Sequence, residues 1–189
     1  AAPAAAVVDA DHCNGCRRCV VDCPYGAISL VPHPNGKLFQ QLALVDGDRC
    51  AGCGICAGAC PTSTPFRRDQ RLVAGIDMPQ LPVDALRQQV RARLDALPGG
   101  PKVLVFGCDQ GADIAALRRP GAVGISLLCA GQLPPSFVEF ALRAANAEQE
   151  AILETATSGI ALIKDRLLLR CNRRLHEMFG WPLGEMVGK

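Results

Sequence analysis

The chain has 189 residues, which accommodates one or two domains, and 49% of them are hydrophobic but only 4% aromatic, so any core must be aliphatic. The formal net charge is +2 and the basic residues are scattered, which argues against nucleic-acid binding. No apolar stretch reaches about 18 residues, and the first residues lack the basic start and long apolar run of a signal peptide, so the sequence predicts neither a membrane span nor secretion.

The first third of the chain contains one cysteine pattern twice. Residues 7–33 predict a strand, a cysteine loop, a short helix and a second strand, and residues 38–60 restart that order. Each copy follows Cys-x-x-Cys-x-x-Cys-x-x-x-Cys-Pro, with Cys13, Cys16, Cys19 and Cys23 in the first copy and Cys50, Cys53, Cys56 and Cys60 in the second. The repeat predicts two similar halves on a pseudo-twofold plan.

The spacing of these cysteines favours an iron–sulfur centre. Three thiolates around one loop and a fourth before a proline suit a cubic [4Fe–4S] cluster, in which each iron takes one soft ligand. Zinc and a disulfide framework are the two alternatives. A third cysteine at the same spacing has no role in a zinc ribbon, which argues against zinc. Cluster assembly needs free thiolates and therefore a reducing cytoplasm, which argues against a disulfide framework. We therefore predict two [4Fe–4S] clusters and a cytoplasmic location.

Each half resembles the bacterial two-[4Fe–4S] ferredoxin family, over residues 7–66. The resemblance implies the fold of that family and an electron-carrier role. In such pairs the fourth cysteine of each run serves the other cluster. The expected ligands are Cys13, Cys16, Cys19 and Cys60 for cluster 1, and Cys50, Cys53, Cys56 and Cys23 for cluster 2. With both oxidised clusters and their thiolates counted, the net charge changes from +2 to about −2.

The next segment is irregular and then helical. Residues 61–82 contain four prolines and little periodicity, which indicates a linker or a wrapping segment. Apolar residues at Leu86, Val90, Leu94 and Leu97 predict an amphipathic helix over residues 84–97, ended by Pro98-Gly99-Gly100-Pro101.

Residues 102–148 predict a small α/β segment. A strand over residues 103–106 leads to Gly107-Cys108, a helix is expected over 112–118, and a second strand over 123–128 leads to Cys129. Strand–helix–strand order predicts a parallel pair, so both cysteines would lie at the carboxyl ends of their strands, where open α/β sheets bind ligands. After Pro134-Pro135 a helix is expected from residue 136 into the 150s.

Residues 102–143 resemble the delta subunit of methyl-viologen-reducing hydrogenases, through Val103-Leu104-Val105-Phe106-Gly107-Cys108 and Leu127-Leu128-Cys129-Ala130-Gly131. That resemblance implies a [2Fe–2S] cluster and a hydrogenase or heterodisulfide reductase as partner. Here Asp109-Gln110-Gly111 replaces a cysteine expected after the first, and the later cysteine-rich segment of the family is missing. A [2Fe–2S] cluster needs four ligands, which Cys108 and Cys129 alone do not supply. Two interpretations stay open for them, a redox-active thiol pair and two buried structural cysteines.

The tail resembles the start of a PAS domain, through Ser158-Gly159-Ile160-Ala161-Leu162 and Met178-Phe179-Gly180-Trp181. Strands are expected over residues 158–163 and 166–170, and helices over 172–179 and 181–187. Cys171 and His176 are interpreted as packing or surface residues rather than as ligands.

The sequence as a whole predicts an α+β protein in four parts. These are a two-cluster ferredoxin domain at 1–66, a linker and amphipathic helix at 67–101, the α/β segment at 102–148 and the PAS-like part at 149–189. No catalytic constellation is evident. We expect an electron-transfer module of a larger oxidoreductase, with redox proteins as partners. The alternative is a redox- or oxygen-sensing protein in which the clusters feed the PAS-like part. The chain is also expected to be a piece of a longer protein.

Overall fold

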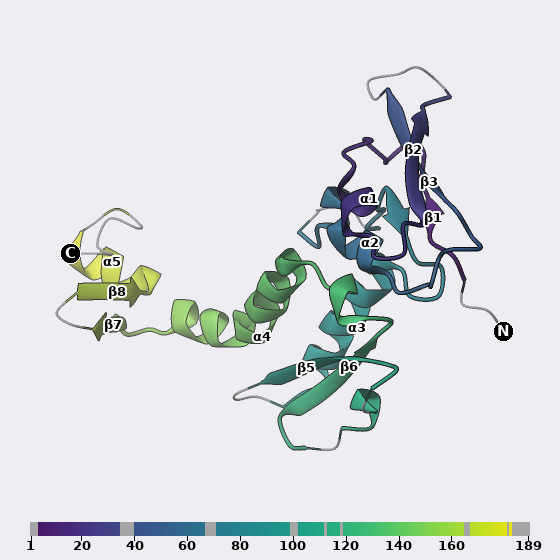
Figure 1. Ribbon diagram of the computed structural model, residues 1–189. Coiled ribbons are helices and arrows are strands. Elements are labelled where there is room, and N and C mark those ends of the chain that lie inside the picture. Colours follow the sequence, from purple (N-terminus) through teal and green to yellow (C-terminus); the bar gives the residue numbers. More distant parts are fainter. Residues whose placement is uncertain are drawn as a thin grey trace. The chain divides into compact units, whose positions relative to one another are not determined.

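The computed structural model describes residues 4–34, 40–66, 71–98, 102–111, 113–117, 119–164, 167–180 and 182. The chain divides into two compact units, Ala1–Ala144 and Ala145–Lys189. Within the described residues the fold is mixed α+β, as predicted, and consists of small two-stranded sheets and helices (Figure 1). None of the helices in this part of the chain is both long enough and apolar enough to cross a membrane.

The first unit begins with the predicted strands, cysteine loops and helices of the two halves. Its elements are β1 (Val7–Val8), α1 (Arg18–Asp22), β2 (Ile28–Pro32), β3 (Gln41–Val45), α2 (Ile55–Ala59) and β4 (Ile76–Asp77). β4, which was not predicted, serves as the closing strand of the second half. β2 and β3 form an antiparallel hairpin, with Ile28 opposite Val45 and Pro32 opposite Gln41, and β1 pairs antiparallel with β4. Each sheet therefore joins a strand of one half to a strand of the other half.

The proline-rich segment after the second cysteine run packs into the core of the first unit. It starts with a 3₁₀ turn, η1 (Pro61–Ser63), and later supplies β4. The side chains of Leu72, Ala74, Ile76 and Met78 are buried, and Gly75 between them is buried as well. The apolar side chains at every second position are those expected of an extended segment with one face on the core. The prolines on either side of it hid the strand in the sequence.

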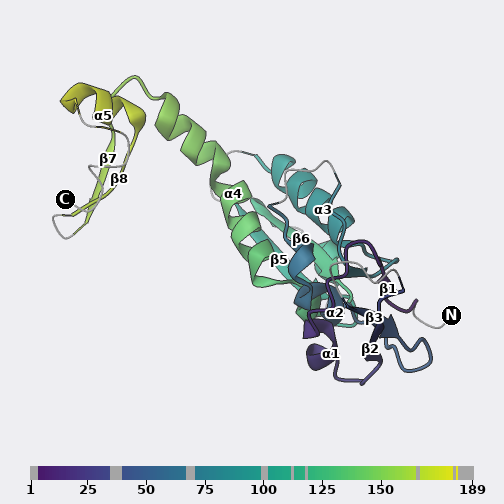
Figure 2. The same cartoon turned by 90° about the horizontal axis from the view of Figure 1, so that it is seen from above.

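α3 (Val83–Asp95) confirms the predicted amphipathic helix. Val83, Leu86, Val90 and Leu94 form its buried face, and the helix packs against β6 (Figure 2). At its start the carboxylate of Asp77 accepts hydrogen bonds from the backbone N–H groups of Met78 and Val83, at 2.8 and 3.1 Å. Burial raises the pKa of Asp77, and these N–H donors oppose that shift. The hydrogen bonds that the half-buried Asp77 carboxylate accepts attach the first turn of α3 to the end of β4.

The two apolar strands of the α/β segment are parallel, as predicted. β5 (Val103–Cys108) and β6 (Ala122–Leu127) pair in register from Val103 opposite Ala122 to Cys108 opposite Leu127. The helix expected over 112–118 is a 3₁₀ turn, η2 (Ile114–Ala116), in the described residues. η2 lies directly on the sheet, because a Cβ on Gly124 would fall 1.8 Å from the Ile114 carbonyl oxygen. Such a close approach leaves no room for a full helix with side chains on that side.

The α/β segment is packed onto the cysteine-rich half through η3 (Ala130–Gln132) and α2. A Cβ on Gly58 would lie 2.3 Å from the Gly131 carbonyl oxygen, so the two backbones are in direct contact. Gln132 is fully buried. Its Nε2 donates to the Leu81 carbonyl at 2.9 Å, and its Oε1 accepts from the Leu128 N–H at 3.2 Å. One side chain therefore joins the segment before α3 to the strand end after β6.

α4 (Pro135–Thr155) confirms the predicted long helix and continues into the second unit. Its part within the first unit is anchored by aromatic contacts. The Phe140 ring packs edge to face against the rings of Phe66 and of the fully buried Phe137, with centroids 6.1 Å apart in both pairs. These contacts attach α4 to the segment that follows the second cysteine run.

The second unit contains a hairpin and a helix. β7 (Ala161–Lys164) and β8 (Leu167–Cys171) pair antiparallel, and α5 (Arg173–Phe179) follows. Asn172, fully buried, caps α5: its Oδ1 accepts from the backbone N–H groups of Leu175 and Ile160. The Asn172 Nδ2 donates to the Ser158 carbonyl at 3.0 Å. Both predicted strands and the first predicted helix are present, and the helix expected over 181–187 lies outside the described residues except for residue 182, which is not helical.

Replacing Gln132 by alanine would test the contact between the two parts of the first unit. The Leu81 carbonyl and the Leu128 N–H would lose their partner, and each buried unsatisfied group costs about 1–3 kcal/mol. We expect the anaerobic thermal midpoint, followed by circular dichroism, to fall by roughly 5–10 °C. Gln89→Ala, an exposed position on α3, is the matched control. Equal midpoints for the two variants would contradict the role of Gln132.

Candidate metal centres

An aspartate shapes the turn that leads into each cysteine run. In the first half, the Asp9 carboxylate accepts from the N–H groups of Asp11 and His12, and the Asp9 carbonyl accepts from the Cys13 N–H. In the second half, Asp46 repeats this arrangement with the N–H groups of Asp48 and Cys50. Neither aspartate was predicted from the sequence, although each lies four positions before the first cysteine of its run.

The two cysteine loops also share their backbone conformation. Gly15 and Gly52 have φ values of 63° and 68°, and they occupy the same position between the first two cysteines of each run. A Cβ on Gly15 would lie 2.5 Å from the Gln41 carbonyl oxygen, so both conformation and space require glycine there. One position after the second cysteine, Arg17 and Gly54 have φ values of 70° and 79° and start α1 and α2. The repeat is thus one of backbone shape as well as of sequence.

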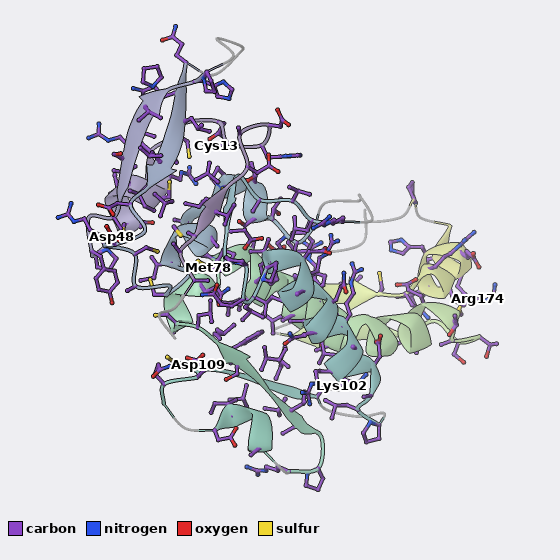
Figure 3. The ribbon with its side chains drawn as sticks, turned by 90° about the vertical axis from the view of Figure 1, so that its right-hand side faces the viewer. Cys13, Asp48, Met78, Lys102, Asp109 and Arg174 are labelled. Atoms are coloured by element: carbon purple, nitrogen blue, oxygen red, sulfur yellow. The ribbon has the colours of Figure 1, made fainter. Side chains whose placement is uncertain are left out.

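The eight cysteines line two cavities. The four expected for each cluster meet in one of them, and each group combines three cysteines of one run with the last cysteine of the other run. The first cavity is lined by Cys13, Cys16, Cys19 and Cys60, and the second by Cys23, Cys50, Cys53 and Cys56. Apolar side chains complete the walls, including Leu30 and Ile76 in the first cavity and Ile28 and Met78 in the second. Figure 3 labels Cys13 of the first cavity, Met78 of the second cavity and Asp109, which follows β5.

Burial makes these thiols hard to ionise without a metal. It raises the pKa of Cys19 to about 11, and the neighbouring thiolates, Cys60 among them, add to the increase. It raises the pKa of Cys56 to about 12, and the thiolates of Cys50 and Cys53 add to that increase. Four thiolates in one cavity therefore need cationic iron between them, and binding the metal displaces their protons. The donor set fits a [4Fe–4S] cluster in each cavity.

The two alternatives to iron–sulfur clusters find no support in the geometry. None of the eleven cysteines is paired in a disulfide, so the structure offers no support for a disulfide framework. Among the described residues, no three His, Cys, Asp or Glu side chains gather closely enough to hold a single metal ion. A structural zinc site requires four ligands around one point. The irons of a cubic cluster lie at separate corners, so its four ligands can stand further apart.

Thr62 is a polar neighbour of the first cavity that the sequence analysis did not identify. Its Oγ1 lies 3.0 Å from the Cys60 Sγ and accepts a hydrogen bond from the Gly75 N–H at 2.7 Å. Because the Gly75 N–H already donates to it, the Thr62 hydroxyl is free to direct its own hydrogen at the Cys60 sulfur. The sequence around Thr62 does not indicate this contact. It forms only because the chain folds back and brings Gly75, just before β4, beside the first cavity.

The remaining cysteines lie outside these two cavities. Cys108 ends β5 and Cys129 follows β6, as predicted, and both are half-buried. They line an open cleft of about 680 Å³, which also contains residues of the second cysteine loop. In the second unit, the Cys171 Sγ lies 3.1 Å from the Nε2 of the buried His176. This pair was missed because its five-residue spacing crosses the start of α5.

Residues 12–64 match the family of 4Fe-4S dicluster domains. They form such a domain, hold two [4Fe–4S] clusters and serve electron transfer. The match agrees with the ferredoxin resemblance over residues 7–66. No curated protein and no solved structure matched the chain.

Gly75→Ala would test the wall of the first cavity. A Cβ at this position would lie 2.8 Å from both the Cys13 Cα and the His12 carbonyl oxygen, so the first cysteine loop would have to move. We expect the iron content after anaerobic purification to fall from about eight to about four per chain. Gly47→Ala is the control, since its Cβ would meet only the Ala5 Cβ, at 4.0 Å. Equal iron contents in the two variants would show that the cavity tolerates the added methyl group.

Proposed function

We propose that this chain is an electron-transfer module of a larger oxidoreductase of the hydrogenase or heterodisulfide reductase kind. Cluster 1 is held by Cys13, Cys16, Cys19 and Cys60, and cluster 2 by Cys23, Cys50, Cys53 and Cys56. The observation that carries the proposal is the gathering of these thiols in two cavities, each with three cysteines of one run and one of the other. When bound, the clusters supply one-electron redox chemistry.

The residues of the chain hold the clusters close to one another and in an apolar setting. Cys19 in the first cavity is close enough to Cys56 in the second cavity to be among the minor causes of the raised pKa of Cys56, after burial. α1 and α2 pack together and carry Cys19 and Cys56 on their buried sides. An electron entering at one cavity therefore has a short route to the other through packed protein.

The larger assembly is supported by the α/β segment. It resembles the hydrogenase delta subunit, and η3 packs directly on α2, which carries a cysteine of the second cavity. The proposed partner therefore binds near the second cavity. Anaerobic mixing of the holoprotein with a hydrogenase and hydrogen would test this proposal. Bleaching of the visible cluster absorbance is expected, and the proposal fails if an isolated ferredoxin domain of residues 4–82 accepts electrons equally fast.

A sensor is the second candidate function. The second unit is compact by itself and contains the hairpin and capped helix described above, in the region that resembles the start of a PAS domain. In this version the clusters detect redox state or oxygen and the PAS-like part relays the signal. The full gene discriminates between the two: continuation into a kinase or cyclase supports sensing, and hydrogenase genes beside it support electron transfer.

Cys23→Ala tests the exchange of the fourth ligand between the two runs. Although Cys23 belongs to the first run, it lines the second cavity, so we expect this variant to lose cluster 2 and to keep cluster 1. Electron paramagnetic resonance of the reduced protein, together with iron and sulfide analysis, provides the measurement. Cys171→Ala, in the second unit, should retain both clusters. Loss of cluster 1 alone from Cys23→Ala would refute the exchange.

Thr62→Val tests the hydrogen bond to the Cys60 sulfur. Such a bond offsets the negative charge of the thiolate and favours the reduced cluster, so its removal is expected to shift the reduction potential of cluster 1 to more negative values. The potential is measured by a redox titration followed by electron paramagnetic resonance. Thr64→Val, close by in the same segment, is the control. An unchanged or more positive potential in Thr62→Val would exclude this role for the hydroxyl.

A further inference from the structure

The cleft that contains Cys108 and Cys129 adjoins the second cavity. Tyr25, Ala51 and Cys53 line both of them. On its other side the cleft is bounded by the two strand ends of the α/β segment, with Asp109 next to Cys108. A volume of about 680 Å³ leaves the cleft open to water and to small molecules. A proposed ligand of cluster 2 and two further thiols therefore share one cleft.

The two thiols of the α/β segment are held close to each other by the parallel sheet. Cys108 lies opposite Leu127 in the register, and the Asp109 N–H donates to the Leu127 carbonyl at 2.8 Å. The Cys108 Sγ lies 3.4 Å from the Leu128 carbonyl oxygen. That carbonyl belongs to the peptide bond that leads directly into Cys129, so the Cys108 sulfur lies one peptide plane from the Cys129 backbone. The two cysteines therefore lie at neighbouring strand ends on one wall of the cleft, which is the arrangement from which a disulfide could form after a local backbone adjustment.

The packing of η3 on α2 fixes this pair relative to the second cavity. The backbone contact between Gly58 and Gly131 leaves no room for a side chain, and the buried Gln132 bonds to the Leu128 N–H, beside Cys129. Gln80 holds the opposite wall, since its Nε2 donates to the Gly52 carbonyl in the second cysteine loop at 3.2 Å. Hydrogen bonds therefore fix both the strand-end side and the cysteine-loop side of the cleft, and both sides belong to the first unit.

We propose that Cys108 and Cys129 form a dithiol–disulfide couple that exchanges electrons with the iron–sulfur centre of the second cavity. The proposal rests on the electron-transfer function above. Reduction breaks the S–S bond, consumes two electrons and two protons, and leaves two thiols; oxidation reverses each of these changes. The two one-electron clusters together supply the two electrons. Protons enter from the water of the open cleft, beside the exposed Asp109 carboxylate.

Such a couple gives the cleft a defined function. Clusters handle electrons one at a time, whereas disulfides and many organic acceptors take two. The pair would collect two single electrons and offer them together to a substrate or partner that reaches the cleft. The substrate class that follows from this chemistry is an oxidant that accepts two electrons through thiol exchange, such as a second disulfide.

Peptide mapping of the holoprotein tests whether the bond forms. The anaerobic protein is treated with one equivalent of diamide, the remaining thiols are alkylated, and the digest is analysed by mass spectrometry. We expect a peptide linked between Cys108 and Cys129, and we expect that link to disappear after two electrons per chain are delivered by photoreduced deazaflavin. Independent alkylation of both thiols after diamide treatment would overturn the proposal.

The dark recovery of the clusters tests whether the couple exchanges electrons with them. After photoreduction of the diamide-treated protein, the bleached visible absorbance should recover in the dark as the disulfide is reduced. In Cys108→Ser and Cys129→Ser the bleach should persist, whereas the matched control Cys171→Ser should behave as the wild type. A persistent bleach in the wild type, with the disulfide intact, would also overturn the proposal. Iron and sulfide analysis separates these outcomes from failure of the proposed function, which would appear as missing clusters.

Discussion

Each of the two cysteine-lined cavities is closed by a cysteine from the opposite half of the chain. Cys60 reaches the first cavity and Cys23 reaches the second. The strands cross in the same way, because β1 pairs with β4 and β2 pairs with β3. Neither half can complete its site or its sheet alone. Binding energy at either metal centre is therefore also energy for holding the two halves together.

Charge is the second constraint on this arrangement. The cavities bury thiols among aliphatic side chains, and the raised pKa values of Cys19 and Cys56 reflect the cost of that burial. In the proposed sites iron would compensate the thiolate charge, and groups that point at sulfur would add finer control. Thr62 is the proposed example, since its Oγ1 accepts from the Gly75 N–H beside β4 and lies 3.0 Å from the Cys60 Sγ. A strand that looks like part of a linker in the sequence is thus a part of the site.

The α/β segment extends the same packed unit beyond the dicluster domain. A glycine contact between α2 and η3 and the buried amide of Gln132 tie β6 to the cysteine-rich half. Their effect is to place two more thiols at a cleft whose walls include the second cysteine loop. The further redox role that we propose depends on this packing more than on either thiol alone, because half-buried cysteines at strand ends are common and inert when nothing reactive lies near them.

The sequence by itself determined the chemistry and most of the local structure. The cysteine spacing indicated two [4Fe–4S] clusters, four-residue periodicity predicted α3, and two apolar runs predicted the parallel pair of β5 and β6, because ligand spacing and hydrophobic period are local properties. Asp9 and Asp46 stand at equivalent positions of the same repeat, although neither was predicted as a site residue. Only the tertiary structure decided that β4 completes the first sheet, that η2 is a single turn pressed onto Gly124, and that Thr62, Gln132 and the Cys171–His176 pair make their contacts. These features join residues far apart in the chain or depend on the space left between packed backbones, and no local pattern of side chains encodes either.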